Sequence, residues 1–160
     1  MKNSKNIVII PARIGSKRIK EKNIKIFHKK PIIYWTIKSL NQTKLFDKIF
    51  VSTDSNKIVK VLKKFNFENI ILRNKSLSND KIGTNAVVID AIKKIKKRIN
   101  LENVWCFYPC NPFIVKSELK EALYKIEKNL NSLVFPVVQY NHPIERAYEI
   151  KKNILKRLYK

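Results

Sequence analysis

Short runs of apolar, largely β-branched residues alternate along this chain with segments in which apolar residues recur with a helical period. The runs predict strands at 6–10, 48–54, 69–73, 104–109 and 132–138, and 146–150 is a candidate for one more. The segments of helical period predict helices at 31–42, 56–66, 84–99 and 116–130. Pro31 fits the first position of its helix, and Thr84 and Ser117 are candidate N-caps.

Repeated strand–helix units with short connections predict a Rossmann-like α/β fold, in which a mainly parallel sheet carries helices on both faces. No internal repeat, low-complexity tract or linker is visible, so residues 1–160 are expected to form a single domain. Ligands of such sheets lie at the carboxyl ends of the strands. That rule selects the loops 11–23, 52–55, 73–84 and 108–114, and a fifth segment, 139–146, follows the last clear strand.

The chain carries a formal net charge of +23, from 35 basic and 12 acidic residues. Nucleic acid, an anionic membrane or a polyanionic substrate would each suit such an excess. Lys, Asn and Ile share A/T-rich codons, however, and the cations are spread along the whole chain. The aromatic residues follow the strand and helix periods and do not interleave with the basic runs. We therefore expect a solvated basic surface and no nucleic-acid partner.

Two cysteines, Cys106 and Cys110, stand in a C-x3-C spacing, and no second Cys or His pair nearby completes a zinc site. Buried, reduced thiols are the expectation, which fits a cytosolic protein. The N-terminal IVII run is too short for a signal peptide, and no stretch approaches a membrane span. The sequence thus predicts a soluble, cytoplasmic protein with no membrane partner.

The loop after the first predicted strand, PARIGSKRIKEKN, concentrates cations around a turn of small residues. Arg13 and Lys17 are four residues apart, with Gly15 and Ser16 between them. Exposed backbone N–H groups with flanking cations suit a triphosphate. The loop has neither the GK[ST] pair of a Walker A motif nor the GxGxxG of a dinucleotide site. A phosphate-binding loop and a plain basic surface loop both stay open, and the chemistry favours the first.

Motifs along the whole chain resemble those of the CMP-sialic acid synthetase family, the CTP-dependent cytidylyltransferases that activate nonulosonic acids. They are IPAR-x-GSKR-I-x-x-KN-I, FDKIFVSTDSNKI, LR-x-x-x-LSxDxxGT, YPCNPF and VFPVVQYNHPIERAYEI, in the family's order. The last segment, and the Tyr-Pro at 108–109, are most similar to the pseudaminic acid branch. Ile14 and Lys20 stand where the family often has Gly and Pro. A β-branched residue at position 14 disfavours a positive φ.

The resemblance implies roles for residues of the first loop. Arg13 and Lys17 match positions that contact the CTP phosphates, and they are the candidate catalytic residues. Lys22 and Asn23 match a pair placed near the nucleotide, where Asn offers both a donor and an acceptor. One more solvated lysine is the alternative interpretation of Lys22.

Further binding candidates lie in the segment 73–84. Arg73 matches a nucleotide-contacting arginine, and the alternative is a surface salt bridge, for example to Asp80. The backbone around Ile82 and the hydroxyl of Thr84 match the segment that reads cytosine, and Ser78 in the same motif is also a candidate. An N-cap role of Thr84 is compatible with base recognition.

The remaining candidates come from later in the chain. Tyr108 and Asn111 lie at a strand end that could hold a sugar or a base, and a Pro-bounded turn is the alternative. Arg146 is a candidate for the sugar carboxylate. Asp54 is expected to organise its loop, and His142 is expected to be structural.

The implied reaction is attack of the anomeric hydroxyl of a nine-carbon keto-acid sugar on the α-phosphorus of CTP, which expels pyrophosphate. Pseudaminic acid is preferred over sialic acid, and ketodeoxyoctulosonate is a sister alternative. The resemblance also implies Mg²⁺ as cofactor and a homodimer for full-length members. No Asp-x-Asp pair occurs in the 160 residues, and no residue is assigned as a metal ligand. We therefore expect the N-terminal, nucleotide-binding part of such an enzyme, with nucleotide binding without turnover as the alternative function.

Overall fold

A computed structural model describes residues 2–16, 18–78, 82–129 and 132–159 of the chain. The chain divides into two compact units, Met1–Ser117 (unit 1) and Glu118–Lys160 (unit 2), which are described separately. The expectation of a single domain over residues 1–160 stays a prediction. Within the described ranges, no helix is both long enough and apolar enough to cross a membrane.

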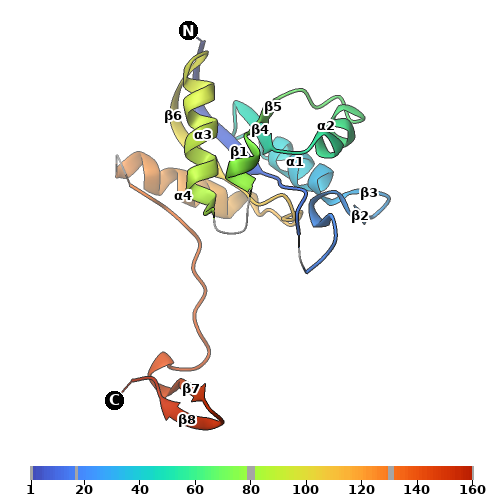
Figure 1. The fold of residues 1–160 in the computed structure, drawn as a ribbon. Coiled ribbons are helices and arrows are strands. Elements are labelled where there is room, and N and C mark those ends of the chain that lie inside the picture. The colour runs from blue at the N-terminus through green and yellow to red at the C-terminus, as the bar shows by residue number, and fades with distance from the viewer. Residues whose placement is uncertain (1, 17, 79–81, 130–131, 160) are drawn as a thin grey trace. The chain divides into compact units, whose positions relative to one another are not determined.

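Unit 1 contains a four-stranded sheet, three helices and a small hairpin (Figure 1). The sheet strands are β1 (Lys2–Pro11), β4 (Lys48–Thr53), β5 (Ile70–Leu72) and β6 (Ile99–Cys106). The helices are α1 (Ile32–Thr43), α2 (Asn56–Lys63) and α3 (Thr84–Lys96). The hairpin pairs β2 (Ile26–Phe27) with β3 (Lys30–Pro31), and two 3-10 turns cover Lys22–Ile24 and Lys75–Ser78. The hairpin was not predicted.

All neighbouring strands of the main sheet run parallel, in the order β5-β4-β1-β6. The central strand is β1, whose Ile7 is aligned with Lys48 of β4 on one side and with Val104 of β6 on the other. Counted in chain order within the sheet, this is the 3-2-1-4 arrangement of a doubly wound sheet, in which the chain moves outward in one direction and then crosses over. Helix α3 belongs to that crossover, since it connects β5 to β6 at opposite ends of the order.

Alternate residues of β1 enter two different cores because successive strand side chains point to opposite faces of a sheet. Val8 and Ile10 pack with the buried stripes of α1 and α2. Ile7 and Ile9 pack with the buried face of α3. All four side chains are fully buried, which explains why the central strand is a continuous apolar run. The predicted α/β fold with helices on both faces of a parallel sheet is confirmed.

Several predicted element boundaries are wrong by one or more residues. Pro31 precedes α1, and α3 begins at Thr84 itself, so Gly83 and not Thr84 is its N-cap. Ser117 lies inside the first turn of α4 (Lys116–Lys128), which starts one residue earlier. Ile99, assigned to a helix from its apolar spacing, begins β6 and is aligned with Lys2 of β1. At such a junction a residue such as Ile99 fits both a helical period and a strand. Its pairing with a neighbouring strand determines which structure it adopts.

Unit 2 contains most of α4, a 3-10 turn (Ile144–Arg146) and an antiparallel hairpin of β7 (Tyr148–Lys151) and β8 (Ile154–Arg157). The connecting residues Lys152 and Asn153 both have positive φ, at 49° and 63°, as a tight hairpin turn requires. The candidate strand at 146–150 is therefore found close to its predicted position. Its partner is β8, and it is not a member of the parallel sheet.

The predicted strand at 132–138 is wrong, because residues 132–140 form no helix or strand. The apolar side chains of this segment are largely solvent-exposed, at 84% for Leu133 and 91% for Val138. A strand requires a neighbour to pair with, and Pro136 in addition lacks an N–H donor. Apolar β-branched composition alone is therefore not enough to make this segment a strand.

Candidate functional site

The carboxyl ends of β1, β4, β5 and β6 meet at one edge of the sheet, called here the carboxyl edge. The main-chain N–H of Ala12 donates to Ser52 O at 2.8 Å, and that of Arg73 donates to Thr53 O at 2.9 Å. On the other side of β1, the N–H of Phe107 donates to Ile9 O at 3.2 Å. The loops predicted at 11–23, 52–55, 73–84 and 108–114 thus start from adjacent positions. Residues 139–146 belong to unit 2.

The first loop is held by its own polar groups. Asn23 is buried and donates from Nδ2 to the main-chain carbonyl of Arg13 at 2.7 Å. Glu21 adopts a left-handed φ of 53° and receives Lys57 Nζ of α2 on both carboxylate oxygens, at 2.6 and 2.7 Å. Arg13 is half-buried and Lys22 is exposed, while Lys17 lies outside the described residues. The loop therefore has a defined path near Arg13.

Ile14, which departs from the family pattern, contributes to the core. Its side chain packs against the cluster of buried residues shared by β1, α1 and α2. Neither Ile14 nor either glycine of the chain has a positive φ, so the loop does not need the backbone freedom of glycine at position 14. The substitution therefore anchors this turn to the core without strain.

Arg73 is buried at the carboxyl edge, with only 2% of its side chain exposed. Its Nε donates to Ser78 Oγ at 3.0 Å, and its Nη1 donates to Ser52 O at 3.1 Å. The second guanidinium nitrogen lies 3.8 Å from Asp54 Oδ1. Burial lowers the pKa of Arg73, and the nearby carboxylate of Asp54 opposes that shift. The partner suggested from the sequence, Asp80, lies outside the described residues.

Asp54 acts as expected in organising its loop, through its ion pair with Arg73. Within the described part of the chain, its Oδ1 and the Oγ of Ser52 are buried without a hydrogen-bond partner. Buried polar atoms without partners are uncommon in folded proteins and need an explanation. Here both lie at the carboxyl edge, where a bound ligand or water could supply the missing partner.

Thr84 and Tyr108 come together across the carboxyl edge, with Thr84 Oγ1 and Tyr108 Oη 3.2 Å apart. Tyr108 is 64% exposed, so its ring presents a free face to solvent. Ile82 is half-buried two residues before Thr84. The structure thus brings the two segments predicted to hold base and sugar side by side.

The loop after β6 is fixed by hydroxyl groups of α1, which the sequence analysis did not single out. Thr36 Oγ1 donates to Pro109 O at 2.9 Å and accepts the main-chain N–H of Asn111 at 3.1 Å. One turn later, Ser39 Oγ donates to Pro112 O at 2.8 Å. A polar residue inside the apolar stripe of a predicted helix was the available signal, since Thr36 lies three residues after the buried Ile33 and four before the buried Leu40.

Cys110 contacts the first loop from the loop after β6. Its Sγ lies 3.3 Å from Asn23 Oδ1, and burial raises the pKa of the thiol, while the charge of Lys22 opposes that rise. Both cysteines are free, as predicted, but Cys106 is exposed. It lies at the end of β6, which has a strand neighbour on one side only within the described sheet. The expectation that both thiols are buried is therefore wrong.

His142 and Arg146 are both exposed, in unit 2. Nothing in the contacts within unit 2 tests the proposed roles of either residue. The carboxylate role of Arg146 therefore stays a prediction.

The donor side chains of the described residues do not gather into a metal site. Outside the gaps at residues 1, 17, 79–81, 130–131 and 160, no group of three or more His, Cys, Asp or Glu side chains is close enough to hold an ion. The carboxylates described in the carboxyl-edge loops, Glu21 and Asp54, are paired with Lys57 and Arg73. The described residues alone do not fit a protein-bound Mg²⁺ site.

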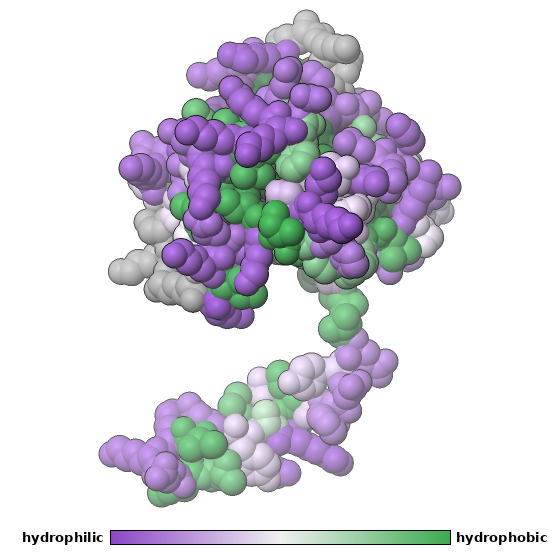
Figure 2. Space-filling view, turned by 90° about the vertical axis from the view of Figure 1, so that its right-hand side faces the viewer, coloured by the Kyte–Doolittle hydropathy of each residue, from purple (hydrophilic) through white to green (hydrophobic). Residues whose placement is uncertain are grey.

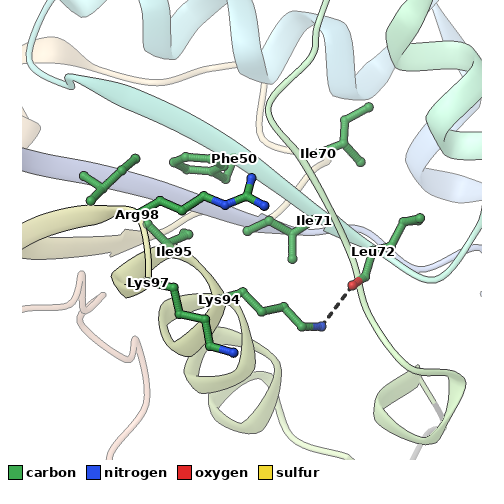
Figure 3. Close-up of a pocket in the computed structure, with 9 residues that line it drawn as sticks. Phe50, Ile70, Ile71, Leu72, Lys94, Ile95, Lys97 and Arg98 are labelled. Carbon is green, nitrogen blue, oxygen red and sulfur yellow. Dashed lines mark hydrogen bonds between the residues drawn. The ribbon is translucent and has the colours of Figure 1, made fainter. Parts of the chain in front are cut away.

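A groove of about 350 Å³ lies elsewhere, between β5 and the C-terminal end of α3 (Figure 3). Its floor is apolar, and Lys94, Lys97 and Arg98 line its side. Lys94 Nζ donates to the main-chain carbonyl of Leu72 at 2.9 Å and to Asp90 Oδ2 at 2.8 Å. None of the predicted site residues lines this groove, so we do not assign the candidate site to it.

The lysines are distributed over the surface along the whole described chain and are not confined to one segment. All lysines whose side chains are described are exposed, except the half-buried Lys48. Hydrophilic side chains cover most of the face drawn in Figure 2, with hydrophobic ones gathered between them. This distribution agrees with the expected solvated basic surface.

Comparison with known proteins gives the family. A profile of the Cytidylyltransferase family matches residues 7–159, nearly the whole chain. The chain belongs to the cytidylyltransferase family. Within it, the pseudaminic acid cytidylyltransferase of Campylobacter jejuni subsp. jejuni serotype O:2 is 35% identical over 150 residues, which cover 93% of this chain and 65% of that relative. This cytidylyltransferase chain thus spans slightly less than two thirds of the length of that relative.

Two further similarities support the family and the fold. The N-acylneuraminate cytidylyltransferase of Oncorhynchus mykiss is 36% identical over 146 residues, covering 90% of this chain and 32% of that protein. The solved structure of CMP:2-keto-3-deoxy-manno-octonic acid synthetase complexed with CTP matches with a TM-score of 0.68. It covers 80% of this chain and 49% of that chain at 20% identity, so it bears on the cytidylyltransferase fold alone.

Proposed function

We propose that this chain binds CTP at the carboxyl edge and transfers its cytidylyl group to a nonulosonic acid, with pseudaminic acid as the preferred acceptor. The observation that carries the proposal is the 35% identity, over 93% of the chain, to a protein named for that reaction. The geometry supports it, because four loops of the predicted site start from adjacent positions at the carboxyl edge.

In this reaction, the anomeric hydroxyl of the sugar forms a bond to the α-phosphorus of CTP. The bond from that phosphorus to the bridging oxygen breaks, pyrophosphate leaves, and the hydroxyl proton goes to solvent or to a base. Catalysis of phosphoryl-type transfer depends mainly on positioning and charge neutralisation. Arg13 and Lys17 are proposed to neutralise the phosphates, with Lys22 as a third cation.

The base and the sugar are proposed to lie along the neighbouring loops. The backbone near Ile82 and the hydroxyl of Thr84 would contact cytosine, and the exposed ring of Tyr108 lies beside Thr84. Asn111 has an exposed side chain on the same loop as Tyr108 and would contact the sugar. Arg146 is proposed for the sugar carboxylate.

Mg²⁺ is proposed as a cofactor that accompanies the triphosphate and withdraws charge from its oxygens. The described residues do not form a site of their own for the ion. A homodimer is likewise proposed from the family resemblance, and a cytoplasmic location is proposed from the free cysteines.

A second function, CTP binding without turnover, is favoured because the carboxylates described in the carboxyl-edge loops, Glu21 and Asp54, are both paired with cations of the protein. In the described part of the chain no acidic cluster is available to complete a metal-dependent site. The two functions share the nucleotide site and differ in the chemical step alone.

The test is pyrophosphate release by the purified 160-residue chain with CTP, Mg²⁺ and separate samples of pseudaminic, sialic and ketodeoxyoctulosonic acids. We expect release with CTP and the highest rate with pseudaminic acid, while UTP and ATP serve as matched nucleotide controls. CTP binding in a calorimeter without release would establish the second function. Absence of CTP binding would overturn both, and nucleic-acid binding that weakens steeply with salt would support a different role.

A further inference from the structure

Helix α1 makes three hydrogen bonds to the loop after β6, and all come from two hydroxyl side chains. Thr36 is fully buried, and its Oγ1 both donates to Pro109 O and accepts from the N–H of Asn111. Ser39 donates to Pro112 O from one turn further along. These bonds join residues that are 73 to 75 positions apart in the sequence.

The behaviour of Thr36 is unusual for a threonine in a helix. Such hydroxyls commonly bond a carbonyl of the preceding turn of their own helix. Thr43, which is also buried in α1, does so, since its Oγ1 donates to Leu40 O at 2.7 Å. Both hydrogen bonds of Thr36, one donated and one accepted, are instead made with the distant loop. Helix α1 therefore helps to determine where that loop lies.

From this loop the hydrogen bonds continue to the first loop. Cys110, between the two residues that Thr36 holds, places its Sγ 3.3 Å from Asn23 Oδ1. The other end of the Asn23 amide donates to Arg13 O at 2.7 Å. A chain of contacts thus runs from Thr36 through Cys110 and Asn23 to the backbone of Arg13.

We propose that Thr36 is a positioning residue of the nucleotide site, which sets the loop after β6 and, through Cys110 and Asn23, the backbone that carries Arg13. This inference rests on the proposed function. Thr36 is too deeply buried to touch CTP itself, and its effect passes through two loops. Without the hydroxyl of Thr36, the carbonyl of Pro109 and the N–H of Asn111 would both lose their partner, so the loop would be held less firmly.

The test compares Thr36→Val with Thr43→Val, a matched control in the same helix that removes a buried hydroxyl with a local partner. CTP binding is measured calorimetrically with Mg²⁺, and thermal unfolding is followed in parallel. We expect a fall of the thermal midpoint in both variants, and CTP binding weakened by about tenfold in Thr36→Val only. Thr36→Ser, which keeps the hydroxyl, should restore binding to within about twofold of wild type.

Equal CTP affinities of Thr36→Val and Thr43→Val would overturn the inference, as would a failure of Thr36→Ser to restore binding. A second measurement does not depend on CTP. Alkylation of Cys110 by iodoacetamide, followed by peptide mass spectrometry, should be faster in Thr36→Val than in Thr43→Val because the loop is less firmly held. If wild type binds no CTP, the proposed function fails alone, and equal alkylation rates in the two variants would still overturn the positioning by Thr36.

Discussion

Two arginines at the carboxyl edge, Arg13 and Arg73, have the same charge but very different surroundings. Arg73 is buried, and its guanidinium donates to Ser78 and to the backbone of Ser52 while it pairs with Asp54. Arg13 is half-buried, its main-chain carbonyl accepts a hydrogen bond from Asn23, and its charge acts on the nearby Arg73. The family resemblance implies that both contact the nucleotide.

The difference shows that the position of an arginine at a ligand-binding edge does not by itself indicate its task. A buried guanidinium whose donors bond the protein supports the loops, whereas a half-buried guanidinium such as that of Arg13 is accessible to a ligand. The substitutions below separate these two tasks, because one should mainly change the free energy of unfolding and the other mainly CTP binding.

Arg73→Ala should have the largest effect. It removes two hydrogen bonds and leaves the buried carboxylate of Asp54 without its cation, so we expect a loss of about 3 kcal/mol in the free energy of unfolding. Urea unfolding followed by circular dichroism measures it. Arg73→Lys keeps the charge without the planar donors and should lose an intermediate amount. Unchanged stability together with lost CTP binding would show that Arg73 serves the nucleotide instead.

Arg13→Ala should weaken CTP binding by about tenfold, because one cation is removed from the phosphates. The free energy of unfolding should change by less than about 1 kcal/mol, since the bond from Asn23 uses the main chain and survives. Isothermal calorimetry and urea unfolding give the two values. The matched control is Arg18→Ala, an exposed arginine of the same loop, for which CTP affinity should stay within about twofold. Equal losses in both variants would point to net charge alone.

Ser78→Ala should have a smaller effect on stability, of about 1 kcal/mol, because it removes one of the hydrogen bonds of Arg73. CTP affinity should fall less than in Arg13→Ala. Combining Ser78→Ala with Arg73→Ala in a double-mutant cycle should show that the two losses do not add, since they share one bond. Fully additive losses would mean that Ser78 acts independently of Arg73.

Lys22→Ala should have the smallest effect, a further rise in the pKa of the Cys110 thiol. Burial already raises that pKa, and the Lys22 cation opposes the rise by stabilising the thiolate. Without it, the alkylation rate of Cys110 should reach its half-maximum at higher pH when measured at low salt. Lys25→Ala removes the same charge from an exposed neighbour and is the control. An equal shift in both variants would contradict a specific Lys22 effect.

The central part of the fold was predictable because its physical requirements are local. The continuous apolar run at Ile7 to Ile10 leaves water only if both faces of the strand are buried. The apolar stripes of α1 and α2 cover one face, and that of α3 covers the other. The segment 132–138 has the same kind of composition, yet most of its side chains are exposed and it pairs with no strand among the described residues. Whether an apolar run becomes a strand depends on a neighbour that composition does not specify.

The location of the site in the fold was predictable from the sequence, whereas most of its hydrogen bonds were not. The rule that ligands lie at the carboxyl ends of strands selected the loops that start together, and Thr84 and Tyr108 are adjacent as a result. The tasks of Thr36 and Ser39 could not be foreseen, because their partners lie 73 residues or more away. Hydrogen bonds of that separation follow from how the elements pack, which no local pattern contains.

The side chain of Lys94 also has a consequence for how copies of the protein meet. Strand β5 is at one end of the sheet within the described residues, and an unpaired strand of this kind can accept a strand from another molecule. Lys94 Nζ already donates a hydrogen bond to the main-chain carbonyl of Leu72. A second hydrogen bond, to Asp90 Oδ2, keeps the ammonium group in this position. An incoming strand could bond this carbonyl only after displacing the ammonium group of Lys94, and a charged side chain would then remain beside the new strand. The last turn of α3 therefore disfavours the addition of a strand at the β5 edge of the sheet.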